Sequence, residues 1–165
     1  MDSEVKLYLR RAEDEFLLSE NDMKISLDIR LKEILGIPKE KTFFNSVITH
    51  AYYSIFYCAK AYLLSKGIKT KPPEEHKKTY LEFAGFADKG ILDKELLKIY
   101  EDEMTKAEVL LDIFLLEKRK RGLFTYNIKS EANIPYARES IGNAKKFVSM
   151  IKLIIERWDT KTQNN

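Results

Sequence analysis

Residues 42–66 read TFFNSVITHAYYSIFYCAKAYLLSK. Their apolar side chains fall on two adjacent stripes of an α-helix, made up of Val47, Ala51, Ile55, Cys58 and Tyr62 on one side and of Ile48, Tyr52, Ala59 and Leu63 beside them. A helix that is apolar over most of its circumference lies at the centre of a domain. Thr42 can cap its start and Gly67 can end it. The segment therefore predicts the central helix of a helical bundle.

Helical periodicity extends outward from this segment in both directions. Two later seams have steps of three and four residues, the first through Leu97, Tyr100, Met104, Ala107, Leu111 and Phe114 and the second through Ala137, Ile141, Ala144, Val148, Ile151, Ile155 and Trp158. A shorter helix is expected over residues 73–87. Residues 3–35 predict either one kinked helix that Ser3 caps or two helices with a joint near Asn21, where polar residues interrupt the apolar stripe.

These segments predict an all-α fold, an up-and-down four-helix bundle with one or two additional short helices. The bundle is expected to be one domain over residues 1–158, followed by a polar tail at residues 159–165. The 165 residues are 44% hydrophobic and 33% charged, which suits a single soluble domain. Six glycines and four prolines leave few turns for an all-β fold.

The sequence also indicates where in the cell the protein is expected and which kinds of functional site it excludes. The charged N-terminus lacks the apolar region of a signal peptide, and no stretch approaches the roughly 20 apolar residues of a membrane span. A cytoplasmic protein without membrane contact is therefore expected. Cys58 is the one cysteine, which excludes an internal disulfide and a cysteine zinc site. The formal net charge of +3 is compatible with a nucleic-acid partner without requiring one.

Three passages resemble the HEPN family (the higher-eukaryote and prokaryote nucleotide-binding domain). They are YLRRAEDE at residues 8–15, HAYYSIFYCAKA at residues 50–61 with LL and KGI just after it, and RKRGLFTY at residues 119–126 leading to the final helix. Their order and spacing together resemble the family over nearly the whole chain. Residues 25–41 form a longer first connection than the minimal family form.

This resemblance implies a four- or five-helix bundle that forms a two-fold homodimer. It also implies a possible partner, a nucleotidyltransferase on a separate chain, in a toxin–antitoxin-like pair. Ribonuclease members of the family use an arginine followed, after four to six residues, by a histidine at the end of one long helix. The family's ligand-contacting arginines correspond in position to Arg119 and Arg121.

The ribonuclease motif is absent from this sequence. The histidines are His50 and His76, and neither is preceded by an arginine at the family's spacing. After Arg121 the chain has Tyr126 and Asn127 where the histidine is expected. Histidine moves protons near neutral pH, whereas tyrosine has an ordinary pKa near 10 and arginine hardly transfers protons. Phosphate binding could therefore persist without catalysis, and we expect no catalytic residue.

The predicted ligand-binding residues are Arg119, Arg121, Tyr126, His50 and Tyr53. The alternative for the basic run at 118–121 is a helix end that opposes the macrodipole. For His50 and Tyr53 the alternative, and the commoner role, is packing in the core or at a dimer interface. A second basic group follows the central helix, made up of Lys66, Lys69, Lys71, Lys77 and Lys78, and a solvated face is the favoured interpretation for it. No cofactor and no metal site is expected.

Three functions remain open from the sequence. The leading hypothesis is a non-catalytic HEPN-like homodimer that binds RNA, a nucleotide or a partner nucleotidyltransferase. The alternative is a degenerate, metal-independent ribonuclease toxin in which Arg119 and Arg121 act with Tyr126 or His50. The third is a protein-interaction scaffold with no nucleic-acid role, whose nine tyrosines and nine phenylalanines would line an interface.

Overall fold

The computed structural model describes residues 2–94, 96–105 and 134–163, with side chains described up to residue 156. Its helices are α1 (Ser3–Leu27), α2 (Ile29–Ile34), α3 (Phe44–Ser65), α4 (Glu75–Asp88) and α7 (Ile134–Gln163), and residues 96–105 are also helical. The described ranges contain helices, turns and loops but no strand. The all-α prediction is confirmed.

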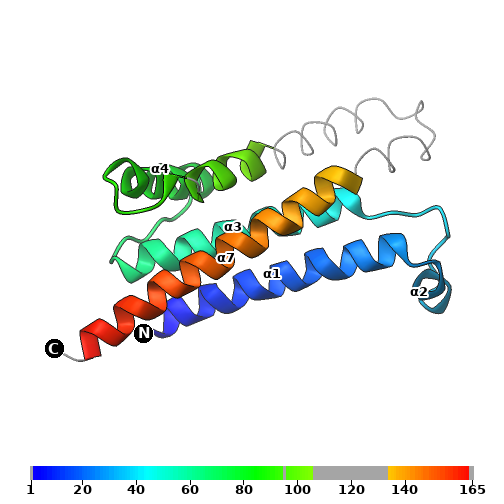
Figure 1. Ribbon diagram of the computed structural model, residues 1–165, viewed down its shortest axis with the longest axis horizontal. Helices are drawn as coiled ribbons and strands as arrows, with labels where there is room; N and C mark the ends of the chain where they lie inside the picture. Colours follow the sequence, from blue (N-terminus) through cyan, green and yellow to red (C-terminus); the bar gives the residue numbers. More distant parts are fainter. Residues whose placement is uncertain (1, 95, 106–133, 164–165) are drawn as a thin grey trace.

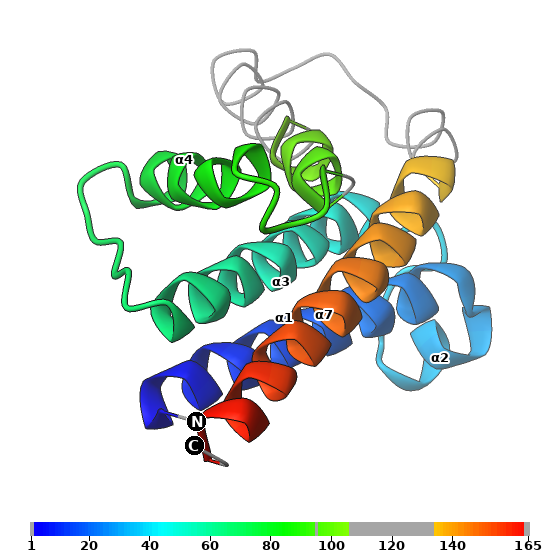
Figure 2. The same cartoon turned by 60° about the vertical axis from the view of Figure 1, so that its left-hand side comes forward.

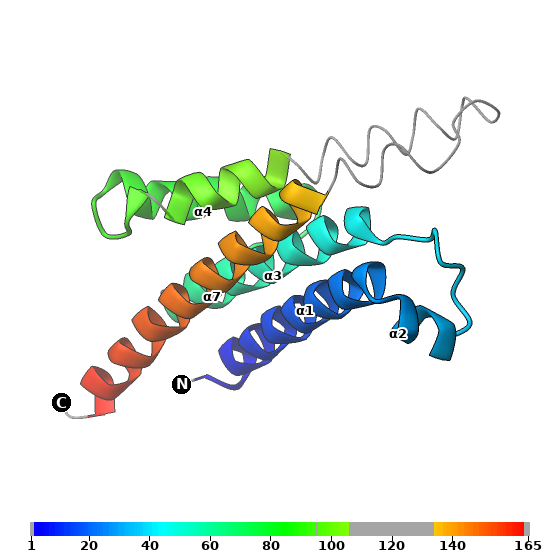
Figure 3. The same cartoon turned by 45° about the vertical axis from the view of Figure 1, so that its right-hand side comes forward.

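The three long helices α1, α3 and α7 lie side by side; α1 runs opposite to α3 and α7, and these two run in the same direction (Figures 1 and 3). The helix at residues 96–105, which lies between α3 and α7 in the chain, runs in the direction of α1 (Figure 1). The pair α1 and α3 makes the most extensive contact, followed by α3 with α7. The helix at residues 96–105 and α4 form a second layer above the three long helices (Figure 2). The short α2 lies at the far end of the bundle, beside the end of α1 (Figure 1). This arrangement confirms an up-and-down bundle with short additional helices.

Helix α3 is the central helix, as its two apolar stripes predict. Alanines at its crossings, including Ala51 and Ala59, are completely buried and let neighbouring backbones approach closely. The Ser54 hydroxyl donates to the carbonyl of Ala12 in α1 at 2.8 Å. Because that donor is satisfied, a hydroxyl can lie inside the α1–α3 interface without a desolvation cost.

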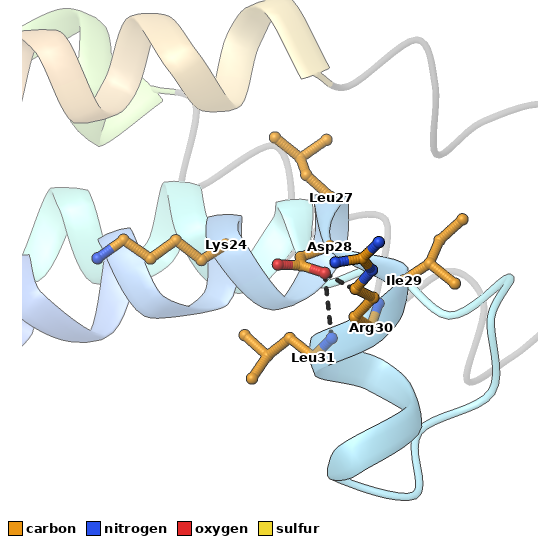
Figure 4. A pocket seen from close by; sticks show the side chains of 6 residues that line it. All are labelled: Lys24, Leu27, Asp28, Ile29, Arg30 and Leu31. Carbon is orange, nitrogen blue, oxygen red and sulfur yellow. Dashed lines mark hydrogen bonds between the residues drawn. The ribbon is translucent and has the colours of Figure 1, made fainter.

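Residues 3–35 form two helices, one of the two alternatives, but the position near Asn21 is wrong for the joint, because α1 continues unbroken to Leu27. The polar residue Ser19 is fully buried, and its hydroxyl donates to the Val47 carbonyl of α3 at 3.1 Å. The break comes at Asp28, whose Oδ1 accepts from the backbone N–H groups of Arg30 and Leu31 and caps α2. Figure 4 shows this corner as a shallow depression, lined by Lys24, Leu27, Asp28, Ile29, Arg30 and Leu31.

Several helix ends differ from the predicted caps. Asp2, rather than Ser3, caps α1 by accepting from the Glu4 N–H group at 2.7 Å. Helix α3 starts without a side-chain cap of its own, and the Phe43 N–H group donates instead to the Ser26 hydroxyl at 2.8 Å. Gly67 follows the C-terminus of α3 with a φ of +79°, a conformation that glycine adopts without strain.

A cluster of aromatic rings joins the second layer to the long helices. Phe83 of α4 contacts Tyr62 of α3 at a centroid separation of 5.8 Å, Tyr100 at 5.7 Å and Phe147 of α7 at 5.4 Å. All four side chains are essentially buried. Three of the ring pairs are close to perpendicular, a geometry that brings a ring edge to a ring face. This cluster holds four helices together.

Candidate functional site

Two of the five predicted ligand-binding residues lie within the described part of the chain. His50 and Tyr53 are about one turn apart on α3, on the partly exposed side of an otherwise buried helix. Arg119, Arg121 and Tyr126, with the basic run at 118–121, lie outside the described residues. The structure therefore shows the surroundings of His50 and Tyr53, and the ligand-binding role of all five residues stays a prediction.

His50 lies in a polar cluster between α3 and α1. Its Nδ1 is 2.7 Å from the Glu15 carboxylate, and its Nε2 is 3.9 Å from the Asp22 carboxylate. Asp22 in turn accepts from the Ser46 hydroxyl at 2.5 Å. With a proton on Nδ1, the imidazole donates to Glu15 and leaves Nε2 as the acceptor. Two carboxylates at this position favour a cation over a phosphate, so His50 is a poor phosphate contact.

Tyr53 lies among aromatic rings that include His76 of α4. The His76 ring stacks on Phe56 at a centroid separation of 4.1 Å, and its Nδ1 is hydrogen-bonded to the Tyr52 hydroxyl at 2.7 Å. Tyr53 contacts the His76 ring edge-on at 5.7 Å. Burial lowers the pKa of His76, with a further lowering by the Lys60 charge and an opposing effect of Glu75. His76 is therefore a neutral packing element between α3 and α4.

The lowered pKa of His76 predicts a pH dependence of stability. The unfolded chain takes up a proton near the ordinary pKa of 6.5, whereas the folded chain does so only at lower pH. Stability is therefore fully present above about pH 6.5 and decreases as the pH falls through the folded pKa. His76→Phe keeps the stack on Phe56 but cannot titrate. We expect urea midpoints between about pH 8 and pH 5 to fall less for this variant than for the wild type, and equal falls would contradict this role.

A group of residues that the sequence analysis missed lies beside Tyr53, and we call Tyr8, Tyr53 and Tyr57 the tyrosine platform. Tyr57 lies next to Tyr53 on α3 at 6.1 Å and next to Tyr8 of α1 at 6.3 Å, with ring planes within 25° of each other. The three side chains are partly exposed. The steps of three and four residues from His50 through Tyr53 to Tyr57 could have indicated the α3 part, but nothing in the sequence pairs it with Tyr8.

Two cations lie against this platform. The Arg11 guanidinium carbon is 4.4 Å from the Tyr57 ring centroid, and the Lys60 ammonium is 4.5 Å from that of Tyr8. Lys60 is only 7% exposed and forms an ion pair with Glu75 of α4. Burial opposes the charge on Lys60, but its hydrogen bonds to Glu75 and Tyr8 outweigh burial and raise its pKa. Lys60 therefore remains charged at neutral pH.

Other kinds of chemistry find little support in the described ranges. They contain no group of three or more histidine, cysteine, aspartate and glutamate side chains placed to hold a metal ion. Cys58 is fully buried, and burial raises its pKa far above the ordinary value, so it is a packing residue and not a nucleophile. None of the described helices is long and apolar enough to cross a membrane.

Comparison with known proteins assigns the family. The model of the HEPN domain matches residues 38–156, which extend from the loop before α3 into α7. A search of curated protein sequences found no match. Helix α1, which contributes Tyr8, Arg11 and Glu15, precedes the matched residues. Because the family model covers well over half of the chain and the fold is an all-α bundle, this protein belongs to the HEPN domain family.

Proposed function

We propose that this protein is a cytoplasmic HEPN homodimer that binds RNA or a nucleotide without cleaving it, with Arg119 and Arg121 as phosphate contacts. In this proposal it acts beside a separate nucleotidyltransferase chain in a toxin–antitoxin-like pair. The proposal that the protein does not cleave RNA rests on the hydrogen bonds and the sequence positions of its two histidines. His50 is bonded to Glu15, His76 is bonded to Tyr52, and neither belongs to the family's arginine–histidine motif.

The surroundings of the histidines support binding over catalysis. His76 is held in an aromatic stack, and burial lowers its pKa, which disfavours at neutral pH the protonated form that a general acid requires. His50 lies beside two carboxylates, and a phosphodiester that approached it would meet like charge. RNA cleavage also requires a second group, one that gives a proton to the leaving oxygen.

The phosphate contacts are tested by replacing both arginines. Arg119→Ala/Arg121→Ala should weaken binding of a labelled RNA about tenfold and flatten its salt dependence, because each lost phosphate contact removes counterion release. The melting temperature should change little. Arg138→Ala/Lys145→Ala removes the same charge from exposed positions of α7 and is the matched control. Equal affinities for the wild type and the double variant would refute the site, and no RNA affinity at any salt would favour a protein-interaction scaffold.

One observation favours the alternative of a degenerate ribonuclease. The Glu15 carboxylate fixes the Nδ1 of His50, and this leaves Nε2 as a potential general base, as in a carboxylate–histidine dyad. The alternative predicts RNA cleavage that survives purification and is lost in both His50→Gln and Arg121→Ala. Our proposal predicts intact RNA in the same samples.

A further inference from the structure

We propose that the tyrosine platform is a binding surface for single-stranded RNA, in which bases stack on Tyr53 and Tyr57 and Arg11 contacts the backbone. This goes beyond the proposed function, because the surface lies on α1 and α3 and requires neither Arg119 nor Arg121. Its α1 half, with Tyr8 and Arg11, precedes the residues that match the family model, and its α3 half lies within them.

The geometry of the rings suits stacking. Tyr57 neighbours both Tyr8 and Tyr53, with interplanar angles of 18° and 25°. Centroid separations above 6 Å mean that the near-parallel rings are offset and do not cover one another fully. The guanidinium of Arg11 lies 4.4 Å from the Tyr57 ring centroid, so a cation for the phosphate backbone lies directly beside the rings. Such a row of planar groups accepts successive bases of any sequence.

The cations around the platform suit a phosphate backbone. Arg11 is exposed, and Lys71, Lys77 and Lys78 are exposed on the segment that leads from α3 into α4. That segment borders the platform, because Lys69 pairs with Glu4, one turn from Tyr8, and the neighbouring Glu75 pairs with Lys60. The second basic group of the sequence analysis is thus next to the platform. The acidic residues Glu15 and Asp22 lie around His50, about one turn before Tyr53, and the charge of Glu15 also acts on Tyr57, where the charge of Arg11 opposes it.

The platform lies on an accessible side of the helix pair. Helices α1 and α3 lie side by side along their length (Figures 1 and 3). Helix α7 contacts α1 through the Lys152–Glu13 ion pair, whereas Tyr8 and Arg11 of α1 meet Tyr57 of α3. The surface mixes rings, hydroxyls and cations, and this composition favours a polyanion with planar groups over an apolar protein segment. At about 1.5 Å per residue, the stretch from Tyr53 to Lys60 is roughly 10 Å long, which accommodates a short single strand.

The test measures anisotropy of a fluorescein-labelled oligouridine of about 12 nucleotides with the full-length protein at low salt. Tyr53→Leu/Tyr57→Leu should weaken binding at least tenfold, whereas Tyr53→Phe/Tyr57→Phe keeps both rings and should stay within about twofold of the wild type. Arg11→Gln should weaken binding and reduce the slope of log affinity against log salt by about 0.7. Arg10→Gln is its matched control, because this neighbouring arginine is also exposed. Should the leucine variant not fold, the two arginine variants decide.

Each outcome separates this inference from the proposed function. If Arg119→Ala/Arg121→Ala weakens binding and the leucine variant does not, the platform is refuted and the proposed phosphate site stands. The reverse result supports the platform and refutes that site. A leucine variant that becomes monomeric with unchanged RNA affinity shows a self-association face and overturns the inference. A wild type that binds no RNA overturns both proposals.

Discussion

Phe83→Ala is expected to destabilise the folded protein by about 3–5 kcal/mol, the cost of truncating a fully buried phenylalanine. Phe83 is 0% exposed, and its ring contacts one aromatic residue from each of three other helices. Its removal leaves a cavity where α4 meets the rest of the bundle. Neighbouring rings cannot collapse into that cavity without breaking their own edge-to-face contacts.

The measurement is the free energy of unfolding from urea titration, followed by far-ultraviolet circular dichroism. Leu81→Ala is the matched control, because Leu81 lies on the same helix and is 57% exposed. Its cost should stay within about 0.5 kcal/mol. A loss below about 1 kcal/mol for Phe83→Ala would mean that the aromatic cluster does not hold α4 in place.

Most of the fold can be predicted from the sequence, because burial of one face of a helix makes apolar residues recur at helical spacing. The two stripes of α3 identify the central helix, and Gly67 identifies its end, since helix geometry alone determines both features. The joint near Asn21 was wrong for a physical reason. Ser19 is polar, but its hydroxyl is satisfied by a carbonyl of another helix, and no local pattern contains that information.

The same limit applies to the candidate site. His50 and Tyr53 stand out on α3 through their residue types and spacing. The partners that give them chemical character, Glu15 and Tyr8, come from α1. Which α1 residue lies opposite which α3 residue depends on how far the two helices slide along each other, and close packing of small residues such as Ala12 determines this offset. The sequence therefore predicts half of each contact.

Removing the carboxylate of Glu75 is the second change expected to have a large effect. Lys60 is 7% exposed and is paired with Glu75, so Glu75→Ala leaves an ammonium group buried between Tyr8 and Phe56 without its counterion. Loss of one partner of a fully buried ion pair costs about 3–5 kcal/mol. The Glu75 side chain is 25% exposed, so solvent screens part of this effect, and we expect about 2 kcal/mol.

The double variant Lys60→Met/Glu75→Ala separates the buried charge from the lost contact. Methionine fills most of the volume of the lysine stem without a charge, so the double variant should be more stable than Glu75→Ala alone. Lys77 and Glu74 are the exposed comparison, because their side chains are 68% and 64% exposed at 3.7 Å, and Glu74→Ala should cost at most about 0.5 kcal/mol. If the double variant were no more stable than Glu75→Ala, an uncompensated ammonium would not be the cause, and α4 would be held by its aromatic contacts alone. If the double variant is more stable and still binds RNA, the charge of Lys60 is not required for binding, and Lys60 acts by positioning Tyr8 and α4.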